Sequence, residues 1–330
     1  MPMAAKISVV ICTRDRPDLI GQAVESVASC DYPEFDLHIM DQSATDATEQ
    51  VLRPLIEKFA DRCPIVYHHL DRAGKSRAYN EGFRATDGTL IACTDDDVVV
   101  PADWLSCIAR AFEGDPAAGL LYGQVRVPES LKNETNVVVP ALTWERRQRL
   151  AHADRNFKVW GMGANMALRR DLLADVGGFD EVMGIGATLR SSEEYDFALR
   201  TYRAKRAILL EPSVAVDHYG ARSYDQWPGT QRTYGFGDGA FYAKHIRCGD
   251  LLALWLFARR LAYVVGQAVY HSLRQRRLVK VSIYGRSLFT GIRASTRFGV
   301  DRRTRLYRET ARGRIEVTEG HAISGARKAP

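Results

Sequence analysis

Short apolar runs alternate with amphipathic stretches along the first third of the chain. The first run, residues 7–12, is rich in β-branched side chains, and residues 17–28 after it carry apolar side chains at helical spacing. The unit recurs, with further strands expected at residues 37–40, 65–68 and 90–93 and further helices at residues 45–59 and 75–85. Strands and helices that alternate at this spacing predict an α/β fold, in which helices cover both faces of a largely parallel sheet.

The pattern is weaker in the next part of the chain. It predicts a helix at residues 104–112, a strand at 120–127, a helix at 169–176 and two short strands at 208–210 and 214–216. Residues 128–158 are polar and mixed, and they predict no element. The glycine-rich stretch 161–166 permits close approach of the backbone to a ligand, although it also suits an ordinary turn.

Polar side chains follow three of the expected strands at the points where the strands end. They are Thr13 and Arg14, Asp41 and Gln42, and the run Asp95, Asp96 and Asp97. Because the carboxyl ends of parallel strands meet at one rim, where open α/β sheets bind ligands, this arrangement favours a nucleotide crevice. Lys75 begins a helix at the same rim, where free backbone N–H groups and a cation suit phosphate. The sequence has neither a P-loop nor a dinucleotide-binding glycine motif.

The run of three aspartates directly follows an apolar strand, where adjacent carboxylates repel one another and lose solvation. Asp95 and Asp97, two residues apart, can share a ligand, and oxygen ligands favour a hard cation such as Mg²⁺ or Mn²⁺ that also binds phosphate. We therefore consider two interpretations, a metal-diphosphate site and a solvated acidic turn. The motifs that follow along the chain favour the metal site.

A second acidic cluster lies at residues 191–200. Local sequence alone favours a structural role for it, because Ser191 with Glu194 fits a capping box and Asp196 with Arg200 forms a favourable i,i+4 pair. His218 follows the last expected strand, where a single histidine is more often structural than a metal ligand.

The net charge of +6 hides an asymmetry between two parts of the chain. Residues 251–330 hold 17 Lys and Arg against 4 Asp and Glu, whereas the first 250 residues hold 29 against 36. A basic C-terminal part suggests an anionic partner, either membrane lipid or nucleic acid, unless it is a solvated basic helix. The six cysteines are scattered and no apolar leader precedes residue 7, so we expect a cytoplasmic protein with reduced thiols.

Residues 251–273 form a long apolar stretch, which Arg259 and Arg260 interrupt. A central pair of arginines argues against a helix that spans a membrane. Two interpretations remain equally open. One is an amphipathic helix that lies on the inner face of a membrane, and the other is a helix that packs on the rest of the protein.

Taken together, these segments resemble a family 2 glycosyltransferase with the GT-A fold, over residues 6–222. The motifs that carry the resemblance follow the order of the family: residues 8–14 (SVVICTR), 41–46 (DQSATD), 94–97 (TDDD), 163–166 (GANM), 177–181 (GGFDE), 193–196 (EEYD) and His218. The resemblance implies a GT-A catalytic domain at residues 1–222, followed by a basic, mainly helical extension at residues 223–330.

The resemblance also implies the reaction, an inverting transfer of a sugar from a nucleotide diphosphate sugar to a hydroxyl of a glycan or lipid-linked acceptor. UDP- and dTDP-sugars are the favoured donors. The same resemblance assigns three sets of binding residues. The donor nucleotide is bound by Thr13, Arg14, Asp41, Gln42, Lys75, Asp95 and Asp96. Mg²⁺ or Mn²⁺ is held by Asp97, Asp95 and His218, and the sugar or acceptor is contacted by Asn165 and Glu193. Glu194 matches the catalytic base, and Asp196 is the second catalytic candidate.

The sequence departs from the family pattern at three places. Gln42 stands where many members have an aspartate that reads uracil, and Glu194 is one methylene longer than the usual aspartate. The Q-x-x-R-W signature of processive synthases is absent, so we expect a single, non-processive addition. Two other classes remain open, a nucleotidyltransferase with a similar crevice and a protein that binds membrane or nucleic acid through its basic part. Nucleic acid is the less expected of these partners.

Overall fold

The computed structural model describes residues 4–151, 161–277 and 281–310. The strands of its central sheet are β1 (Ile7–Thr13), β2 (Phe35–Asp41), β3 (Ile65–His69), β4 (Leu90–Asp95), β5 (Val98–Val99), β6 (Ala118–Arg126), β8 (Gln148–Leu150), β9 (Asn165–Arg169) and β10 (Ala207–His218). They lie in the order β3, β2, β1, β4, β9, β6, β10 and β5, and β8 pairs with β10 beside this path.

The helices are α1 (Pro17–Ala28), α2 (Ala47–Lys58), α3 (Lys75–Ala85), α4 (Trp104–Glu113), α5 (Leu172–Val176), α6 (Glu193–Arg203), α7 (Trp227–Arg247), α8 (Leu251–Gln275) and α9 (Ile283–Ser295). Small elements complete the part of the chain that is described: a 3₁₀ turn at Glu129–Leu131, β7 (Val137–Val138), β11 (Arg222–Ser223), β12 (Gly299–Val300) and β13 (Tyr307–Arg308).

The strands β3, β2, β1 and β4 are parallel, as the sequence predicts for its first third. Their register sets Thr13 opposite Asp41, and Cys12 opposite Asp95. The polar residues that follow these strands therefore share one rim of the sheet. In the other half, β9 runs antiparallel to both β4 and β6, while β10 is parallel to β6.

The structure refines three predicted segments. The two short strands expected at 208–210 and 214–216 form one strand, β10, which changes register between Glu211 and Ala215. The two-residue strand β5 was not predicted, and it pairs with the end of β10 through Val98 and His218. Residues 128–158, which predict no element, contain β7 and β8, and residues 152–158 lie outside the described part of the chain.

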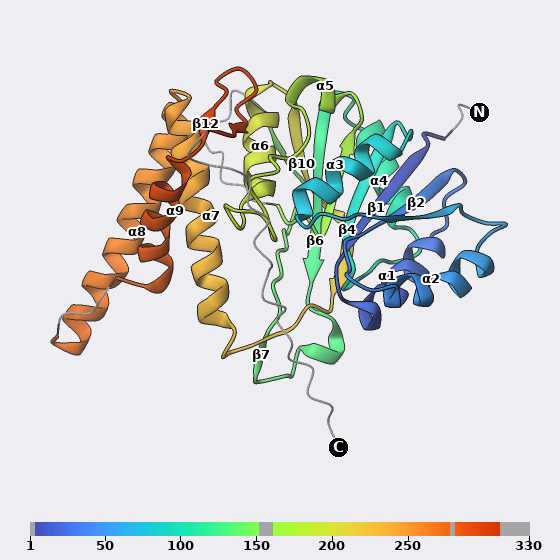
Figure 1. Cartoon of the computed structure of the whole chain (residues 1–330), viewed down its shortest axis with the longest axis horizontal. Helices are drawn as coiled ribbons and strands as arrows, with labels where there is room; N and C mark the ends of the chain where they lie inside the picture. The colour runs from blue at the N-terminus through green and yellow to red at the C-terminus, as the bar shows by residue number, and fades with distance from the viewer. Residues whose placement is uncertain (1–3, 152–160, 278–280, 311–330) are drawn as a thin grey trace.

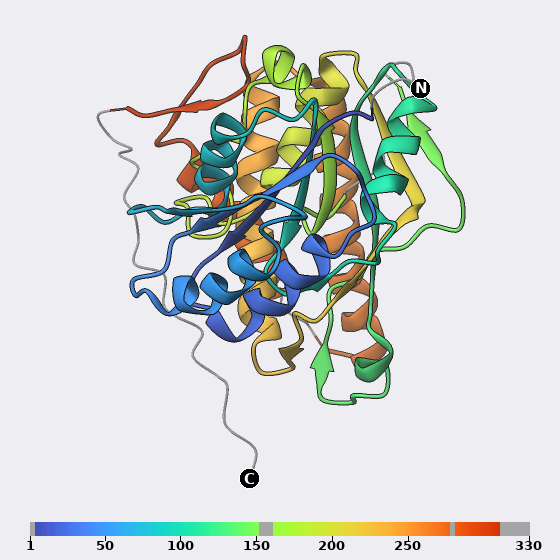
Figure 2. The ribbon, with the colours of Figure 1, turned by 90° about the vertical axis from the view of Figure 1, so that its right-hand side faces the viewer.

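Helices cover both faces of the sheet, so alternate side chains of a strand are buried in different cores. Val9 and Ile11 pack with α1, α2 and α4 in one core, and Val10 packs with α3 and α6 in the other. This arrangement explains why the strands read as continuous apolar runs. The α/β prediction is confirmed, and Figures 1 and 2 show α1 and α2 on the side of the sheet opposite to the C-terminal helices.

The C-terminal helices belong to the second of these cores. Phe241 of α7, Leu288 of α9 and Tyr307 of β13 are buried in the same cluster as Leu199 of α6. The predicted boundary at residue 222 therefore separates two parts of the chain that share one hydrophobic core. Figure 1 shows α8 at the outer edge of this group, on the far side of α7 from the sheet.

Glycines permit close contact between α7 and α9. A Cβ atom on Gly239 would lie 2.0 Å from the carbonyl oxygen of Leu288, and one on Gly291 would lie 1.9 Å from that of Phe236. No larger residue fits these positions without a shift of the backbone. The two helices therefore pack through backbone as well as side chains.

A buried ionic cluster joins α7 to α6. The carboxylate of Asp196 has no exposed surface and lies 2.9 Å from Arg200 Nε, 2.6 Å from Lys244 Nζ and 2.8 Å from His245 Nε2. Lys244 Nζ is also 2.7 Å from Asp180, which accepts a hydrogen bond from the backbone of β13. Although burial alone raises the pKa of Asp196, Lys244, Arg200 and His245 lower it far below its usual range. Asp196 therefore stays charged and holds these elements together.

We expect Asp196→Asn to lower the free energy of unfolding by about 3–5 kcal/mol, because removing one partner leaves buried cations without their counter-charge. Urea denaturation of the two proteins measures this difference. The control is Asp87→Asn, which removes a largely exposed carboxylate from a surface ion pair with Lys6 and should cost less than about 1 kcal/mol. Equal, small losses in both variants would contradict the role of the cluster.

Candidate active site

A pocket of about 340 Å³ lies beside the carboxyl rim of the sheet, and we call it the rim pocket. One wall comes from the strand and helix ends of residues 1–222 and includes Lys75, Asp95, Gly163, Glu193, Glu194 and His218. The opposite wall comes from α7, α8 and α9 and includes Tyr234, Asp238, Arg260 and Tyr284. Five predicted site residues thus line one pocket, whereas the residues of the opposite wall were not predicted.

Lys75 is the cation of the first wall. It occupies the first position of α3, and its Nζ atom lies 2.7 Å from Asp95 Oδ1. Tyr79 donates a hydrogen bond of 3.3 Å to the same oxygen. The Lys75 charge also opposes the rise that burial causes in the pKa of Glu193 and of Glu194. Lys75 therefore acts on these two carboxylates as well as on Asp95.

Glu193 and Glu194 form the start of α6, where the helix dipole favours negative charge. The capping-box interpretation of this segment is wrong. Ser191 donates to the carbonyl oxygen of Thr233 instead, at 3.0 Å. The residue before the helix is Ser192, which has a positive φ of 71° and makes no side-chain cap. The two glutamates are therefore not explained by helix capping.

Burial raises the pKa of both glutamates. For Glu193 the neighbouring Glu194 adds to the effect of burial, and its pKa reaches about 8. Glu194 accepts hydrogen bonds from the backbone of Gly163 and from its own backbone, which oppose part of the rise in its pKa. A Cβ atom on Gly163 would lie 2.7 Å from Glu194 Oε1, so glycine permits this approach. The Glu194 carboxylate is thus oriented at the pocket wall and holds a proton more tightly than an exposed glutamate.

The other aspartates of the rim are neutralised by protein groups. Thr13 Oγ1 donates to Asp96 at 2.7 Å, and one guanidinium nitrogen of Arg16 lies 2.8 Å from Asp96 and 3.0 Å from Asp97. Burial still raises the pKa of Asp96 to about 6. Arg16 was not predicted as a site residue. A cation was to be expected here, because three adjacent carboxylates repel one another.

Asp97 lies beside His218, which lines the rim pocket. The buried Oδ1 atom of Asp97 lies 3.3 Å from His218 Nε2, as an ion pair rather than a well-aligned hydrogen bond. His218 Nδ1 lies 3.0 Å from the carbonyl oxygen of Pro140, which fixes the ring. Burial alone raises the pKa of Asp97, but His218 and Arg16 lower it to about 2. A Cβ atom on Gly220 would lie 2.5 Å from Asp97 Oδ2, so this corner also requires glycine.

This pair fits a divalent cation as a partial set of ligands. A carboxylate oxygen and a ring nitrogen with its other nitrogen held by a carbonyl are typical donors. No group of three or more His, Cys, Asp or Glu that could hold a metal occurs in the described residues, and Asp95 is paired with Lys75. Substrate phosphates and water would have to supply the remaining ligands, as is common for Mg²⁺.

The predicted nucleotide residues at β1 and β2 lie at the same rim but do not line the pocket. Asp41 is fully buried and accepts hydrogen bonds from Ser43 and Tyr67. Both ends of the Gln42 amide bond to the backbone of Gly74, each at 3.2 Å. Arg14 is partly exposed and lies 3.4 Å from the adjacent Asp15.

Asn165 has a structural role. It is fully buried, its Oδ1 accepts from Trp104 Nε1 at 3.0 Å, and its Nδ2 donates to the carbonyl oxygens of Gln124 and Val214. All of its polar groups are occupied inside the sheet, so the prediction that Asn165 contacts the sugar or acceptor does not hold. Asp196 is likewise enclosed by the ionic cluster, so its predicted part in catalysis does not hold either.

Comparison with known proteins agrees with this geometry. The model of the family described as glycosyl transferase family 2 matches residues 8–177, about half of the chain. The chain belongs to glycosyltransferase family 2. This family 2 chain is 27% identical over 186 residues to a glucosyl-dolichyl phosphate glucuronosyltransferase of Haloferax volcanii, covering 54% of the chain and 57% of the relative. It is 25% identical over 221 residues to a β-monoglucosyldiacylglycerol synthase of Synechocystis, covering 63% and 43%. The chain thus spans about half the length of these curated relatives.

Solved structures confirm the GT-A fold. A mannosyltransferase from Pyrobaculum calidifontis, in complex with GDP-Man and Mn²⁺, aligns with a TM-score of 0.58 at 19% identity and covers 89% of this chain and 86% of its own. TarS of S. aureus aligns with a TM-score of 0.52 at 19% identity, covering 69% and 38%. The predicted family and fold are therefore both confirmed.

The pKa of Glu193 leads to a prediction about stability. A carboxyl whose pKa rises on folding, from 4.5 to about 8 here, makes the folded state less stable as pH increases through that interval. Glu193→Gln removes this loss, so its melting temperature relative to wild type should be higher by several degrees at about pH 9 than at about pH 5. Thermal melts at both pH values test this, with the exposed Glu113→Gln as control. A constant difference between Glu193→Gln and wild type would refute it.

Proposed function

We propose that this family 2 protein is an inverting, metal-dependent and non-processive glycosyltransferase. It moves a sugar from a nucleotide diphosphate sugar to a hydroxyl of a lipid-linked acceptor. The observation that carries the proposal is the Glu194 carboxylate, which is oriented by Gly163 and lies in the same pocket as Lys75 and Asp95. One positioned base beside a cationic phosphate site is what a single displacement needs.

The reaction follows from these positions. Glu194 takes the proton of the acceptor hydroxyl while that oxygen attacks the anomeric carbon from the face opposite to the diphosphate. The new C–O bond forms as the bond to the diphosphate breaks, so the configuration inverts. Lys75 faces the developing negative charge of the leaving group, and Asp95 holds the lysine in position. A divalent cation held by Asp97 and His218 would add charge neutralisation at the diphosphate.

Several observations support the choice of partners. The relatives described above are named for a dolichyl phosphate and for a diacylglycerol, both lipids. The solved mannosyltransferase described above is in complex with GDP-Man and Mn²⁺. We propose Mg²⁺ or Mn²⁺ as the cofactor and retain UDP- or dTDP-sugars as the favoured donors. Membership of family 2 argues against the alternative of a nucleotidyltransferase.

We further propose a cytoplasmic enzyme that lies on the inner face of a membrane through α8. Among the described residues, α8 is the one helix long and apolar enough to cross a membrane by length and composition, and 17% of its apolar window is buried. It packs inward through Ala253, Leu256 and Val264. Its exposed large apolar residues are Leu251, Leu254, Trp255, Tyr263, Val265, Val269, Tyr270 and Leu273. A helix with one packed side and one exposed apolar side suits the membrane surface rather than a span.

Asp97→Asn should abolish metal-dependent binding of donor while the fold is kept, because an amide is a weaker ligand than a carboxylate for a hard cation. The measurement is the thermal shift that UDP-glucose or GDP-mannose produces with Mn²⁺ and with EDTA, since a ligand of the native state raises apparent stability. Asp18→Asn, at an exposed aspartate of α1, is the control. The metal assignment fails if Asp97→Asn binds donor as tightly as wild type under both conditions.

Glu194→Gln should reduce sugar transfer by about 10²–10⁴-fold, the usual contribution of a general base. Donor binding and melting temperature should stay close to wild type, because the amide keeps the shape of the side chain. The assay follows transfer to a lipid acceptor and donor affinity in parallel, with Glu113→Gln as a surface control. Transfer at the wild-type rate by Glu194→Gln would refute this base.

A further inference from the structure

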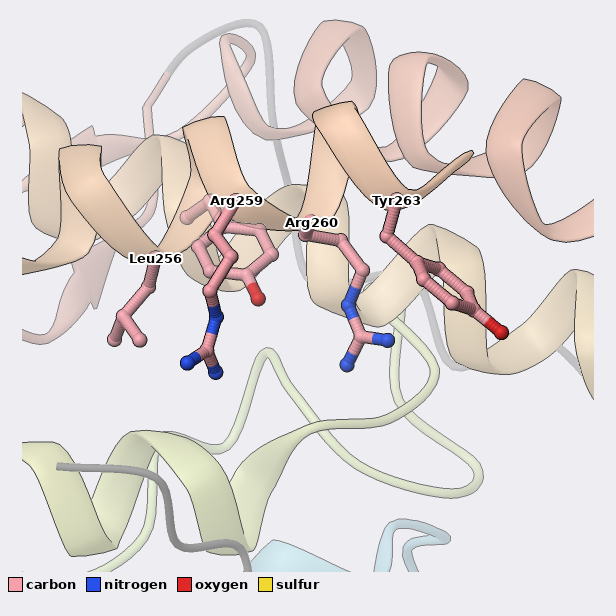
Figure 3. Close-up of a pocket in the computed structure, with 5 residues that line it drawn as sticks. Leu256, Arg259, Arg260 and Tyr263 are labelled. Carbon is pink, nitrogen blue, oxygen red and sulfur yellow. The ribbon is translucent and has the colours of Figure 1, made fainter. Parts of the chain in front are cut away.

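A second pocket lies on α8 beside the rim pocket. It has a volume of about 300 Å³ and is lined by Tyr242 of α7 and by Leu256, Arg259, Arg260 and Tyr263 of α8. Figure 3 shows the side chains of Arg259 and Arg260 pointing away from α8 in the same direction, with a gap between their guanidinium groups. We call this hollow the arginine pocket.

In the part of the chain that the structure describes, the two arginines contact aromatic rings and pair with no carboxylate. Arg259 lies over the ring of Trp255 at 4.9 Å, and Arg260 lies over that of Tyr284 at 5.4 Å. These rings hold the side chains in place but do not neutralise their charge.

Asp238 is the carboxylate that acts on the pKa of Arg260, and its oxygens are hydrogen-bonded to other residues. Asp238 accepts hydrogen bonds from Ser192 Oγ at 2.7 Å and from the Tyr284 hydroxyl, and it makes no ion pair with Arg260. Arg260 is only partly exposed, and although burial alone lowers its pKa, Tyr284, Tyr242 and Asp238 raise it above its usual range, so the guanidinium stays charged. Two guanidinium groups that line one hollow and form no ion pair with a described carboxylate offer an anion site, and their planar donor sets match phosphate.

The position of Arg260 links this anion site to the reaction. Arg260 lines both the arginine pocket and the rim pocket, which also contains Glu194. An acceptor whose phosphate is bound by the arginines can therefore extend its sugar into the rim pocket. The exposed Tyr263 lines the hollow, and the exposed Trp255 lies under Arg259 on the same helix, so apolar surface beside the arginines suits a hydrocarbon chain.

We propose that the arginine pocket binds the phosphate group that joins sugar to lipid in the acceptor. The inference rests on the proposed function and names the class of its acceptor, a glycosylated lipid phosphate or diphosphate. Arg259 and Arg260 bind the phosphate oxygens, the apolar face of α8 meets the lipid chain, and the sugar hydroxyl lies toward Glu194. A neutral glycolipid would leave both arginines without a ligand.

The test measures binding of the protein to three kinds of phosphatidylcholine vesicle. The first contains a polyprenyl phosphate, the second contains the matching neutral polyprenol, and the third contains phosphatidylglycerol in the amount that gives the same total charge as the first. Wild type should bind the polyprenyl phosphate vesicles about tenfold more tightly than either other kind, because hydrogen bonds from a guanidinium group to a phosphate are charge-assisted. Arg259→Gln should lose this preference. Arg274→Gln, an exposed arginine of the same helix outside the pocket, is the matched control and should keep it.

Three results would overturn the proposal. Equal binding to phosphatidylglycerol and polyprenyl phosphate would indicate bulk charge attraction. An unchanged preference in Arg259→Gln would remove the pocket from the interaction, and displacement by inorganic phosphate at millimolar concentration would assign it to free phosphate. Donor binding is measured separately by thermal shift with Mn²⁺. If wild type binds no donor in that assay, the result counts against the proposed function. The vesicle assay then still decides whether the arginine pocket binds a lipid phosphate.

Discussion

A carboxylate without access to solvent determines how the two parts of this chain fit together. Asp196 is enclosed by Arg200 of its own helix and by Lys244 and His245 of α7. The cost of burying such a charge is offset only when its partners are held in good geometry. The same helix carries Glu194 two residues earlier, so the contacts that satisfy Asp196 also position the proposed base. The C-terminal helices are thereby part of the site and not an appendage to it.

The carboxylates of the rim are likewise paired with cations of the protein. Asp95 is paired with Lys75, and Asp96 and Asp97 share Arg16. Each carboxylate that the strand ends bring together has a cation or a hydroxyl group beside it. The contact between Asp97 and His218 is the loosest of these, because the buried Oδ1 atom is not in a well-aligned hydrogen bond. It is therefore the place on the rim where a further cation finds donor atoms without breaking a strong contact.

The parts of the fold that could be predicted from sequence are those determined by local pattern. Alternating strands and helices imply a parallel sheet, and a parallel sheet brings the ends of β1, β2 and β4 to one rim, so Asp41 and Asp95 were correctly grouped. The i,i+4 pair of Asp196 with Arg200 was also predictable, because helix geometry alone produces it.

The errors concern partners that are distant in the chain. Asn165 was assigned to the sugar or acceptor by the family resemblance, but it accepts a hydrogen bond from Trp104 and donates to the carbonyl oxygens of Gln124 and Val214. The capping box failed because Ser191 bonds to Thr233 of α7. The close packing of α7 on α9 depends on glycines, which carry no hydrophobic periodicity. Arg260 had a visible signal, the charged break in an apolar stretch, which argued against a span but did not indicate a pocket.

The two walls of the rim pocket come from different parts of the fold. One wall stands on the strand ends and on α3 and α6, whereas Tyr234, Asp238, Arg260 and Tyr284 of the other wall lie on α7, α8 and α9. Substitutions on α7, α8 and α9 can therefore reshape one side of the pocket while the strand ends keep their register. The substrate that the pocket accepts can therefore change at one wall while the catalytic groups of the other wall are kept.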